Sequence, residues 1–419
     1  MSKTRVLGAL LLAAISAAAQ SPTFTPFHEN GIYALGEKAG WTVKAPEGSA
    51  EGHYFYVIRK NNLDVIQKGM LDLSSGAATI EASLNEPAML YVEVIPGASP
   101  DAGAAKTTPI HLGAAIAPYD LKPSAARPAD FDAFWDGKLK ALAEVPINPV
   151  LTPGEAGKPG VDFYMVKLDS LGSHVQGYLA KPAREGKFPA LVIYQYAGVY
   201  ALQPSTVTDR AAEGWLAFDV DSHDIRPDQA DGVERNYQAA GNTSRETSYF
   251  LDMYLRDARA IDYIASRPDW DGKTIVVMGT SMGGQQSLVT AGLRSNITAV
   301  LVNEPSGADS NGDLHGRKAG YPNWPSNDPK VMETALYFDT VNFASRIKAP
   351  VLAALGFIDT IAPPAGIWTA LDQIPGPKEV IPMVESDHNN KTPEKQGAWV
   401  SRSRDVLETI LHGGEFKPK

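Results

Sequence analysis

The sequence predicts an α/β fold, built on a doubly wound, mostly parallel sheet and preceded by a small all-β immunoglobulin-like sandwich. Two observations lead to this prediction. Residues 21–116 contain only short, alternating apolar segments separated by turn residues, a pattern typical of a β-sandwich module. Residues 117–419 alternate short apolar runs with segments of helical period, which is typical of a parallel sheet covered by helices on both faces.

The composition is that of an ordinary globular protein with an acidic balance. The 419 residues can hold two domains, or one large domain with a small attachment. A net charge of −10 and the lack of any Lys/Arg run argue against nucleic acid and anionic membranes as partners. The sequence has no cysteine, which excludes disulfides and thiolate metal sites.

Residues 1–19 have the pattern of a secretory signal peptide. Lys3 and Arg5 precede an apolar run from Val6 to Ala14, and the small residues Ala17 to Ala19 then offer a cleavage site. The apolar run is too short to span a bilayer stably. We therefore expect cleavage after Ala19 and a protein that is secreted or periplasmic.

The β-module is expected to contain a hairpin. His53–Arg59 runs into Asn61 and Asn62 and continues through Leu63–Ile66, which is the pattern of two strands joined by a tight turn. Further strands are predicted at Ala77–Ile80 and Met89–Ile95. No residue of this module has the setting of a catalytic group.

Prolines between Pro118 and Pro128 mark the start of the second domain, and a helix is predicted from Asp130 to about Val145. Two antiparallel strands follow, at Val161–Leu168 and His174–Ala180. Buried strands are then predicted at Ala190–Tyr194, Leu216–Val220 and Ile275–Met278, and further strands at Ala299–Val302, Val351–Leu355 and Val380–Val384. The helices with the clearest period are Thr247–Ala265, Gln285–Leu293 and Pro393–Leu411.

The most informative motif is Gly279-Thr280-Ser281-Met282-Gly283, which lies between a predicted strand and a predicted helix. A serine between two glycines at such a turn is the nucleophile elbow of α/β-hydrolases, where the tight turn requires glycine for clearance. Unpaired N–H groups at the start of the helix would stabilise an oxyanion formed beside Ser281. We therefore interpret residues 117–419 as an α/β-hydrolase catalytic domain with Ser281 as the nucleophile.

A serine nucleophile requires a histidine base and an acid that orients it, and in this fold they follow in the order Ser, Asp or Glu, His. Three histidines follow Ser281, namely His315, His388 and His412. His388 comes directly after the predicted strand Val380–Val384, which places it at the carboxyl edge of the sheet. We predict His388 as the base, with His315 and His412 as weaker alternatives.

The same argument selects Asp359 as the acid, because it follows the predicted strand Val351–Leu355. Asp387 is the alternative. A carboxylate adjacent to His388 in the sequence cannot easily turn onto the far nitrogen of the imidazole ring. We therefore predict Asp359 as the residue that orients the base.

The oxyanion hole requires two backbone N–H donors near the nucleophile. The first is expected from Met282. In this fold the second comes from the loop after an earlier strand, here the loop that follows Ala190–Tyr194. Tyr196 and Ala197 both remain candidates for it.

Four residues are predicted to bind substrate. His315, Tyr321 and Trp324 belong to the long polar loop Asn303–Pro325, and long loops in compact domains are usually functional. Aromatic rings suit the faces of sugars, although a packing role is the alternative for each ring. His223 follows a predicted strand near the expected cleft.

From about Arg127 onward the sequence resembles the acetyl xylan esterase/cephalosporin C deacetylase family. Pro128-Ala129-Asp130-Phe131-Asp132-Ala133-Phe134-Trp135 is similar to its first helix, and Gly-x-Ser-x-Gly-Gly with a later Asp and His follows its catalytic order. The resemblance implies an α/β-hydrolase that removes acetyl groups from sugar hydroxyls, with Ser281, Asp359 and His388 as its triad. It also implies that no metal or cofactor is needed.

The chain departs from the family pattern at three places. Asp221-Ser222-His223 stands where the family has Arg-Gly-Gln, Met282 stands where it has glutamine, and Asn389 stands where it has glutamate after the histidine. The backbone N–H of Met282 serves as well as that of glutamine, so we expect the triad chemistry to survive. The changes and the added β-module leave open the choice of substrate and whether the chain forms a homo-oligomer.

The leading hypothesis is a secreted serine carboxylesterase that removes acetyl groups from a small-molecule or oligosaccharide ester through an acyl-enzyme intermediate. Two alternatives differ from it. One is a serine hydrolase of the same fold that acts on another ester or on a peptide. The other is a catalytically inactive carbohydrate-binding protein, in which the β-module is the functional part.

Overall fold

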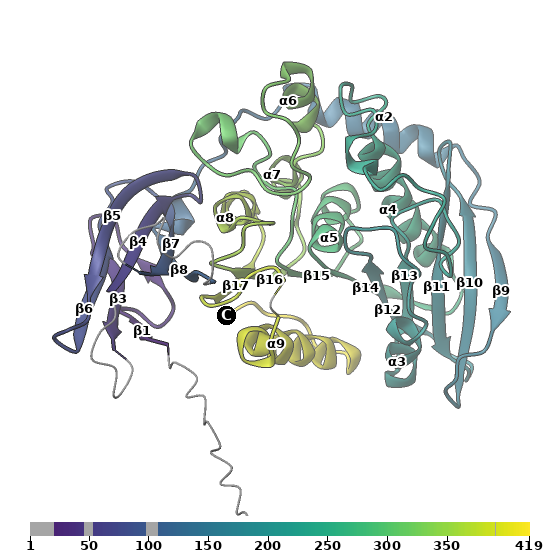
Figure 1. Ribbon diagram of the computed structural model, residues 1–419. Coiled ribbons are helices and arrows are strands. Elements are labelled where there is room, and N and C mark those ends of the chain that lie inside the picture. The colour runs from purple at the N-terminus through teal and green to yellow at the C-terminus, as the bar shows by residue number, and fades with distance from the viewer. Residues whose placement is uncertain (1–20, 46–52, 98–107, 390) are drawn as a thin grey trace, which may run out of the picture.

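The computed structural model describes residues 21–45, 53–97, 108–389 and 391–419. The predicted signal peptide, residues 1–19, lies outside them. A strand-rich N-terminal module lies next to one edge of a large sheet, and helices cover both faces of that sheet (Figure 1). Among the described residues, no helix combines the length and apolar character needed to cross a membrane.

The N-terminal module consists of two packed sheets. One has the strand order β1-β3-β6 and the other β2-β8-β7-β4-β5. Their strands are β1 (Thr23–Pro26), β2 (Ile32–Tyr33), β3 (Ala39–Lys44), β4 (His53–Lys60), β5 (Asp64–Asp72), β6 (Ala77–Ala82), β7 (Ala88–Pro96) and β8 (Ile110–Ile116). Trp41, Ile58 and Val92 fill the space between the two sheets. The predicted hairpin is therefore present as β4 and β5, while β1, β2, β3 and β8 are additional strands.

The second region is built on one sheet of nine strands, with the order β17-β16-β15-β14-β12-β13-β11-β10-β9. Strands β12 to β17 pair in parallel, and β9, β10 and β11 form an antiparallel edge. The strands are β9 (Val150–Gly154), β10 (Val161–Asp169), β11 (His174–Pro182), β12 (Phe188–Tyr194), β13 (Leu216–Val220), β14 (Trp270–Thr280), β15 (Ala299–Asn303), β16 (Val351–Gly356) and β17 (Lys378–Met383). This is the doubly wound, mostly parallel sheet that the sequence predicts.

Helices cover the two faces of this sheet because successive residues of each buried strand point to opposite sides. Val192, Val277 and Ala353 belong to the core that includes α4, α5 and α8. Their neighbours Leu191, Val276 and Leu352 pack with α3 and α9 on the other face. The helices are α2 (Phe131–Ala143), α3 (Ser205–Glu213), α4 (Tyr249–Ser266), α5 (Met282–Leu293), α6 (Pro329–Ala335), α7 (Thr340–Ala344), α8 (Pro364–Asp372) and α9 (Pro393–Leu411), with short 3-10 turns η1 (Pro118–Asp120), η2 (Tyr237–Ala239) and η3 (Gly312–His315).

The N-terminal module packs against the β17 side of the sheet, at the opposite end from β9 (Figure 1). Met89 from β7 and Ala115 from β8 share a core with Phe357, which directly follows β16. The module and the α/β region therefore share buried apolar residues. The loop that follows β16 lies at this junction.

Candidate active site

Ser281 lies at the turn between β14 and α5. Its backbone has a φ of 58° and a ψ of −122°, a combination that is costly for a residue with a side chain. Neighbouring backbone groups hold it there, because Ser281 N–H donates to Asn303 O (3.0 Å) and Ser281 O accepts from Ser306 N–H (3.1 Å). Such local strain is typical of a functional position.

The two glycines that flank the serine are required by close packing. A Cβ atom on Gly279 would lie 2.3 Å from the backbone carbon of Gly283. A Cβ on Gly283 would lie 2.2 Å from Tyr194 O at the end of β12. No side chain fits at either distance, so the elbow can form only with glycine at both positions.

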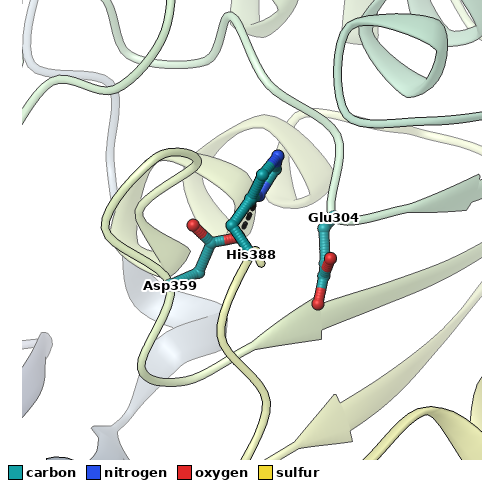
Figure 2. Close-up of side chains that lie close together, drawn as sticks. All are labelled: Glu304, Asp359 and His388. Carbon is teal, nitrogen blue, oxygen red and sulfur yellow. Dashed lines mark hydrogen bonds and ion pairs between the residues drawn. The ribbon is translucent and has the colours of Figure 1, made fainter. Parts of the chain in front are cut away.

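His388 lies between Ser281 and Asp359. Its Nε2 is 2.9 Å from Ser281 Oγ, and its Nδ1 is 2.7 Å from Asp359 Oδ2. Asp359 is fully buried and Ser281 is 7% exposed. Figure 2 shows the imidazole of His388 beside the Asp359 carboxylate, with Glu304 on the other side of His388. The three residues predicted as a triad are therefore hydrogen-bonded in series.

Backbone donors fix the orientation of the Asp359 carboxylate. Asp359 Oδ1 accepts hydrogen bonds from the N–H groups of Ile361 and Ala362, each at 2.8 Å. Oδ2 is then left for the imidazole. An ionised carboxylate can only accept, so His388 Nδ1 carries the proton and Nε2 is free to accept from the Ser281 hydroxyl. This arrangement can deprotonate Ser281 as it attacks a carbonyl carbon.

The alternatives for the base and the acid have other positions or other hydrogen-bond partners than the three residues of the triad. His315 is exposed at the end of η3, and His412 is the C-terminal cap of α9. The Asp387 carboxylate accepts from the backbone N–H of Asn389 at 2.8 Å. Among the described residues, the hydrogen bonds of the His388 ring go to Ser281 and Asp359.

The N–H groups of Met282, Tyr196 and Ala197 make no hydrogen bond within the part of the chain that the structure describes. The N–H of Gly198, the next residue in the same loop, already has a partner, because it donates to the Tyr237 hydroxyl at 3.1 Å. The role of these N–H groups as oxyanion donors stays a prediction. Tyr196 and Ala197 remain equal candidates for the second one.

Two of the four residues predicted to bind substrate, His223 and Trp324, are buried. His223 is fully buried, with Nδ1 bonded to the Tyr249 hydroxyl (2.7 Å) and Nε2 to Gly198 O (3.0 Å). Trp324 is 6% exposed and packs on Phe250 as part of a core, with its indole N–H donating to a backbone carbonyl. Both side chains face the protein interior, so neither offers a surface to a substrate.

The other two predicted contacts differ in position. His315 is exposed on η3, and none of its contacts in the structure reach the Ser281 site. Tyr321 is half-buried, and its hydroxyl lies 3.1 Å from Met282 Sδ and 3.0 Å from the Tyr237 hydroxyl. Tyr321 therefore lies next to the residue that follows the nucleophile, and its contact with substrate stays a prediction.

His223 holds the loop that contains Tyr196 and Ala197, because its ring is hydrogen-bonded to the carbonyl of Gly198. Burial lowers the pKa of His223 to about 4, so the ring is neutral at pH 7. A neutral ring can donate from Nε2 to Gly198 O and accept from the Tyr249 hydroxyl at Nδ1. Asp221 Oδ1 in turn accepts the backbone N–H of His223 at 2.7 Å.

This burial predicts an effect of pH on stability. Between pH 6.5 and pH 4 the unfolded chain binds a proton at His223 that the folded chain does not, so the free energy of unfolding falls as the pH falls. Relative to His223→Gln, which lacks this proton, the wild type should lose about 2 kcal/mol between pH 7 and pH 4.5. Urea unfolding of both chains at the two pH values measures this difference. A pH-independent difference would contradict it.

Glu304, the residue directly after β15, is not among the residues predicted from the sequence. It is fully buried and has a φ of 47°. Its Oε1 accepts from the Ser386 hydroxyl (3.0 Å), and its Oε2 lies 2.7 Å from Lys391 Nζ, so it contacts the chain on both sides of His388. Its position at the carboxyl end of a buried strand was the available signal.

Ligand atoms of Glu304, Asp359 and His388 lie within 4.8 Å of one another (Figure 2). A metal ion bound to all three would compete with the hydrogen bond between His388 and Asp359. We therefore assign Glu304 to support of the His388 loop.

Comparisons with known proteins relate the chain to esterases. The family model described as acetyl xylan esterase matches residues 117–311 and 320–402. An acetyl esterase of Xylanibacter ruminicola is 30% identical over 401 residues, which cover 90% of this chain and 89% of the relative. The matched family residues begin directly after β8, and η3 with His315 falls in the unmatched segment between the two ranges.

Two solved structures share the fold of the α/β region. An acetyl xylan esterase from Paenibacillus sp. R4 has a TM-score of 0.60 and 27% identity, covering 69% of this chain and 98% of that chain. Acetyl xylan esterase 1 from Thermoanaerobacterium has a TM-score of 0.57 and 21% identity, covering 68% of this chain and 96% of that chain. With the family model and the Xylanibacter relative, these findings show that the chain belongs to the acetyl xylan esterase family.

Proposed function

We propose that this protein is a serine carboxylesterase that removes acetyl groups from acetylated carbohydrate through an acyl-enzyme intermediate. One observation carries the serine mechanism, namely the position of His388 between Ser281 Oγ (2.9 Å) and Asp359 Oδ2 (2.7 Å). These distances lie within the reach of a general base and the group that orients it.

In the acylation half, His388 Nε2 takes the hydroxyl proton as Ser281 Oγ attacks the acetyl carbonyl carbon. The resulting imidazolium is stabilised by Asp359, and the oxyanion accepts from Met282 N–H and from one N–H of the loop at Tyr196 and Ala197. When the tetrahedral intermediate collapses, His388 returns the proton to the sugar oxygen, which leaves as an alcohol. Acetyl-Ser281 remains.

In the deacylation half, a water molecule replaces the sugar alcohol. His388 takes a proton from the water as its oxygen attacks the acetyl-enzyme, and a second tetrahedral intermediate uses the same oxyanion donors. The proton then passes to Ser281 Oγ and acetate leaves. One water molecule is consumed for each acetyl group removed.

The substrate class rests on the family and on the surface beside the site. Relatives with this fold are named acetyl esterase and acetyl xylan esterase. Tyr196 is 55% exposed, and its ring stacks on that of Tyr200, with ring centroids 4.6 Å apart. An exposed aromatic face in the loop that carries a proposed oxyanion donor suits the apolar face of a sugar ring. We further propose, from residues 1–19, that the protein is secreted or periplasmic.

Two assays test the proposal. The purified chain should react covalently with a fluorophosphonate at Ser281, as shown by peptide mass analysis, and it should release acetate from acetylated xylo-oligosaccharides. Butyryl and octanoyl esters of the same oligosaccharides and an acetylated peptide serve as matched comparisons. Faster release of the longer acids or cleavage of the peptide would replace the acetyl-carbohydrate assignment. An unlabelled Ser281 would refute the serine mechanism.

A further inference from the structure

The tip of the β4–β5 hairpin in the N-terminal module reaches the loop that carries Asp359. Asn61 and Asn62 form this tip, with φ values of 51° and 59°. A type I′ hairpin turn requires two successive residues in the left-handed backbone conformation, which asparagine tolerates. The hairpin tip is therefore built to keep its shape in the absence of any outside contact.

Both asparagines nevertheless contact the α/β region. Asn62 Nδ2 donates to the backbone carbonyl of Asp359 at 3.2 Å. Asn61 O accepts from Lys318 N–H at 2.9 Å, in the loop between β15 and α6. Asn61 itself is 5% exposed and exchanges hydrogen bonds with Met89 of β7, since its N–H donates to Met89 O (2.7 Å) and its Oδ1 accepts from Met89 N–H (2.9 Å).

The module holds the same loop at a second point. Phe357, two residues before Asp359, is fully buried against the module. A Cβ atom on Gly113 of β8 would lie 2.6 Å from the Phe357 side chain, so only glycine allows this contact. The loop is thus fixed by packing at Phe357 and by a hydrogen bond at the Asp359 carbonyl.

The position of the Asn62 side chain is unfavourable for the free energy of folding. Its Oδ1 is buried and has no hydrogen-bond partner among the described residues. An unsatisfied buried acceptor costs about 1–3 kcal/mol. In the opposite amide orientation, Oδ1 would face the Asp359 carbonyl oxygen, and two acceptors cannot form a hydrogen bond. The observed orientation lets Nδ2 donate to this carbonyl and leaves Oδ1 unpaired. Locally unfavourable choices of this kind are expected at functional sites.

We propose that Asn62 is a positioning residue for catalysis, which acts by holding the Asp359 backbone so that Oδ2 stays aligned with His388 Nδ1. The N-terminal module is then a structural part of the active site. This inference rests on the proposed function, because it requires Asp359 to orient the catalytic histidine. It gives the module a role that does not depend on binding carbohydrate.

The test uses Asn62→Gly in the full-length chain. Glycine keeps the left-handed turn and removes only the side chain, so the hairpin and the melting temperature should be retained. We expect kcat for p-nitrophenyl acetate to fall by about 10-fold, with KM changed by less than about twofold, because alignment of Asp359 matters only when the imidazolium forms. Asn62→Asp, which tolerates the same turn and presents an acceptor to the Asp359 carbonyl, should lose at least as much.

Asn148→Gly is the matched control. Asn148 also has a positive φ, 44°, and its Nδ2 donates to Asp169 at 2.8 Å near the opposite edge of the sheet. It should keep wild-type kcat. A double-mutant cycle with Asp359→Asn gives the second readout, because Asn62→Gly should cause no further loss once Asp359 no longer orients His388.

Wild-type kcat in Asn62→Gly, or the same loss with and without Asp359→Asn, would overturn the inference and leave the proposed function intact. A wild-type chain without esterase activity would refute both.

Discussion

Replacing Ser281 by alanine is expected to lower kcat/KM for acetyl ester hydrolysis by about 10⁴-fold or more. The change removes the oxygen that lies 2.9 Å from His388 Nε2, and with it the acyl-enzyme route. Residual hydrolysis would come from the oxyanion donors and from substrate binding. The elbow tolerates alanine, because the strained backbone of Ser281 is held by the backbone hydrogen bonds with Asn303 and Ser306. Initial rates of acetate release, measured with a coupled assay, test the change.

Ser287→Ala provides the control for Ser281→Ala. Ser287 is a buried serine on α5, and its hydroxyl donates to Gly283 O at 2.8 Å. The same atom is removed close to the elbow, without loss of the proposed nucleophile. This variant should keep activity within about threefold of the wild type and react with the fluorophosphonate. An active Ser281→Ala, or equal losses in both variants, would contradict the assignment of the nucleophile.

The sequence predicts the parts of the fold that have strong local signals. The hairpin over Asn61 and Asn62, the antiparallel pair β10 and β11, and helix α9 are all present. The additional strands β1, β2 and β9 have four, two and five residues, and β1 and β9 are exposed or only half-buried along their length. Segments of this length have too few apolar positions for a period to be recognised. Sheet pairing, and not the local pattern, stabilises them.

The order of the site residues was predictable, but their surroundings were not. Ser281, Asp359 and His388 each follow the carboxyl end of a parallel strand of the same sheet, so their convergence follows from the fold. The burial of His223 depends on Tyr249 and Gly198, and that of Trp324 on Phe250. These contacts join residues that have no common pattern in the sequence.

The same limit applies to the residues that support the triad. Glu304 follows β15 in the same way as Asp359 follows β16, and this signal was available. The hydrogen bond from Asn62 to Asp359 crosses from one sheet system to another over a separation of 297 residues. In the sequence, the tight turn is a sufficient reason for asparagine at position 62. The sequence therefore gives no sign of a second role for this residue.

Asp359→Asn is expected to lower kcat by about 10³- to 10⁴-fold with little change in KM. The N–H groups of Ile361 and Ala362 require an acceptor at the Oδ1 position, so the amide oxygen of the new side chain would occupy it. The amide NH₂ then faces His388 Nδ1 and can only donate. The imidazole would have to carry its proton on Nε2, where it can no longer accept the proton of Ser281.

Asp387→Asn separates this effect from a general loss of negative charge beside the base. Asp387 precedes His388 and was the alternative acid, and its carboxylate accepts from Asn389 N–H and lies 3.6 Å from Lys395 Nζ. Both variants lose one carboxylate that was a candidate for the acid, but only Asp359→Asn changes the partner of Nδ1. We expect Asp387→Asn to keep activity within about fivefold of the wild type. Comparable losses in the two variants would mean that charge alone, and not the hydrogen bond to Asp359, makes the imidazole a base.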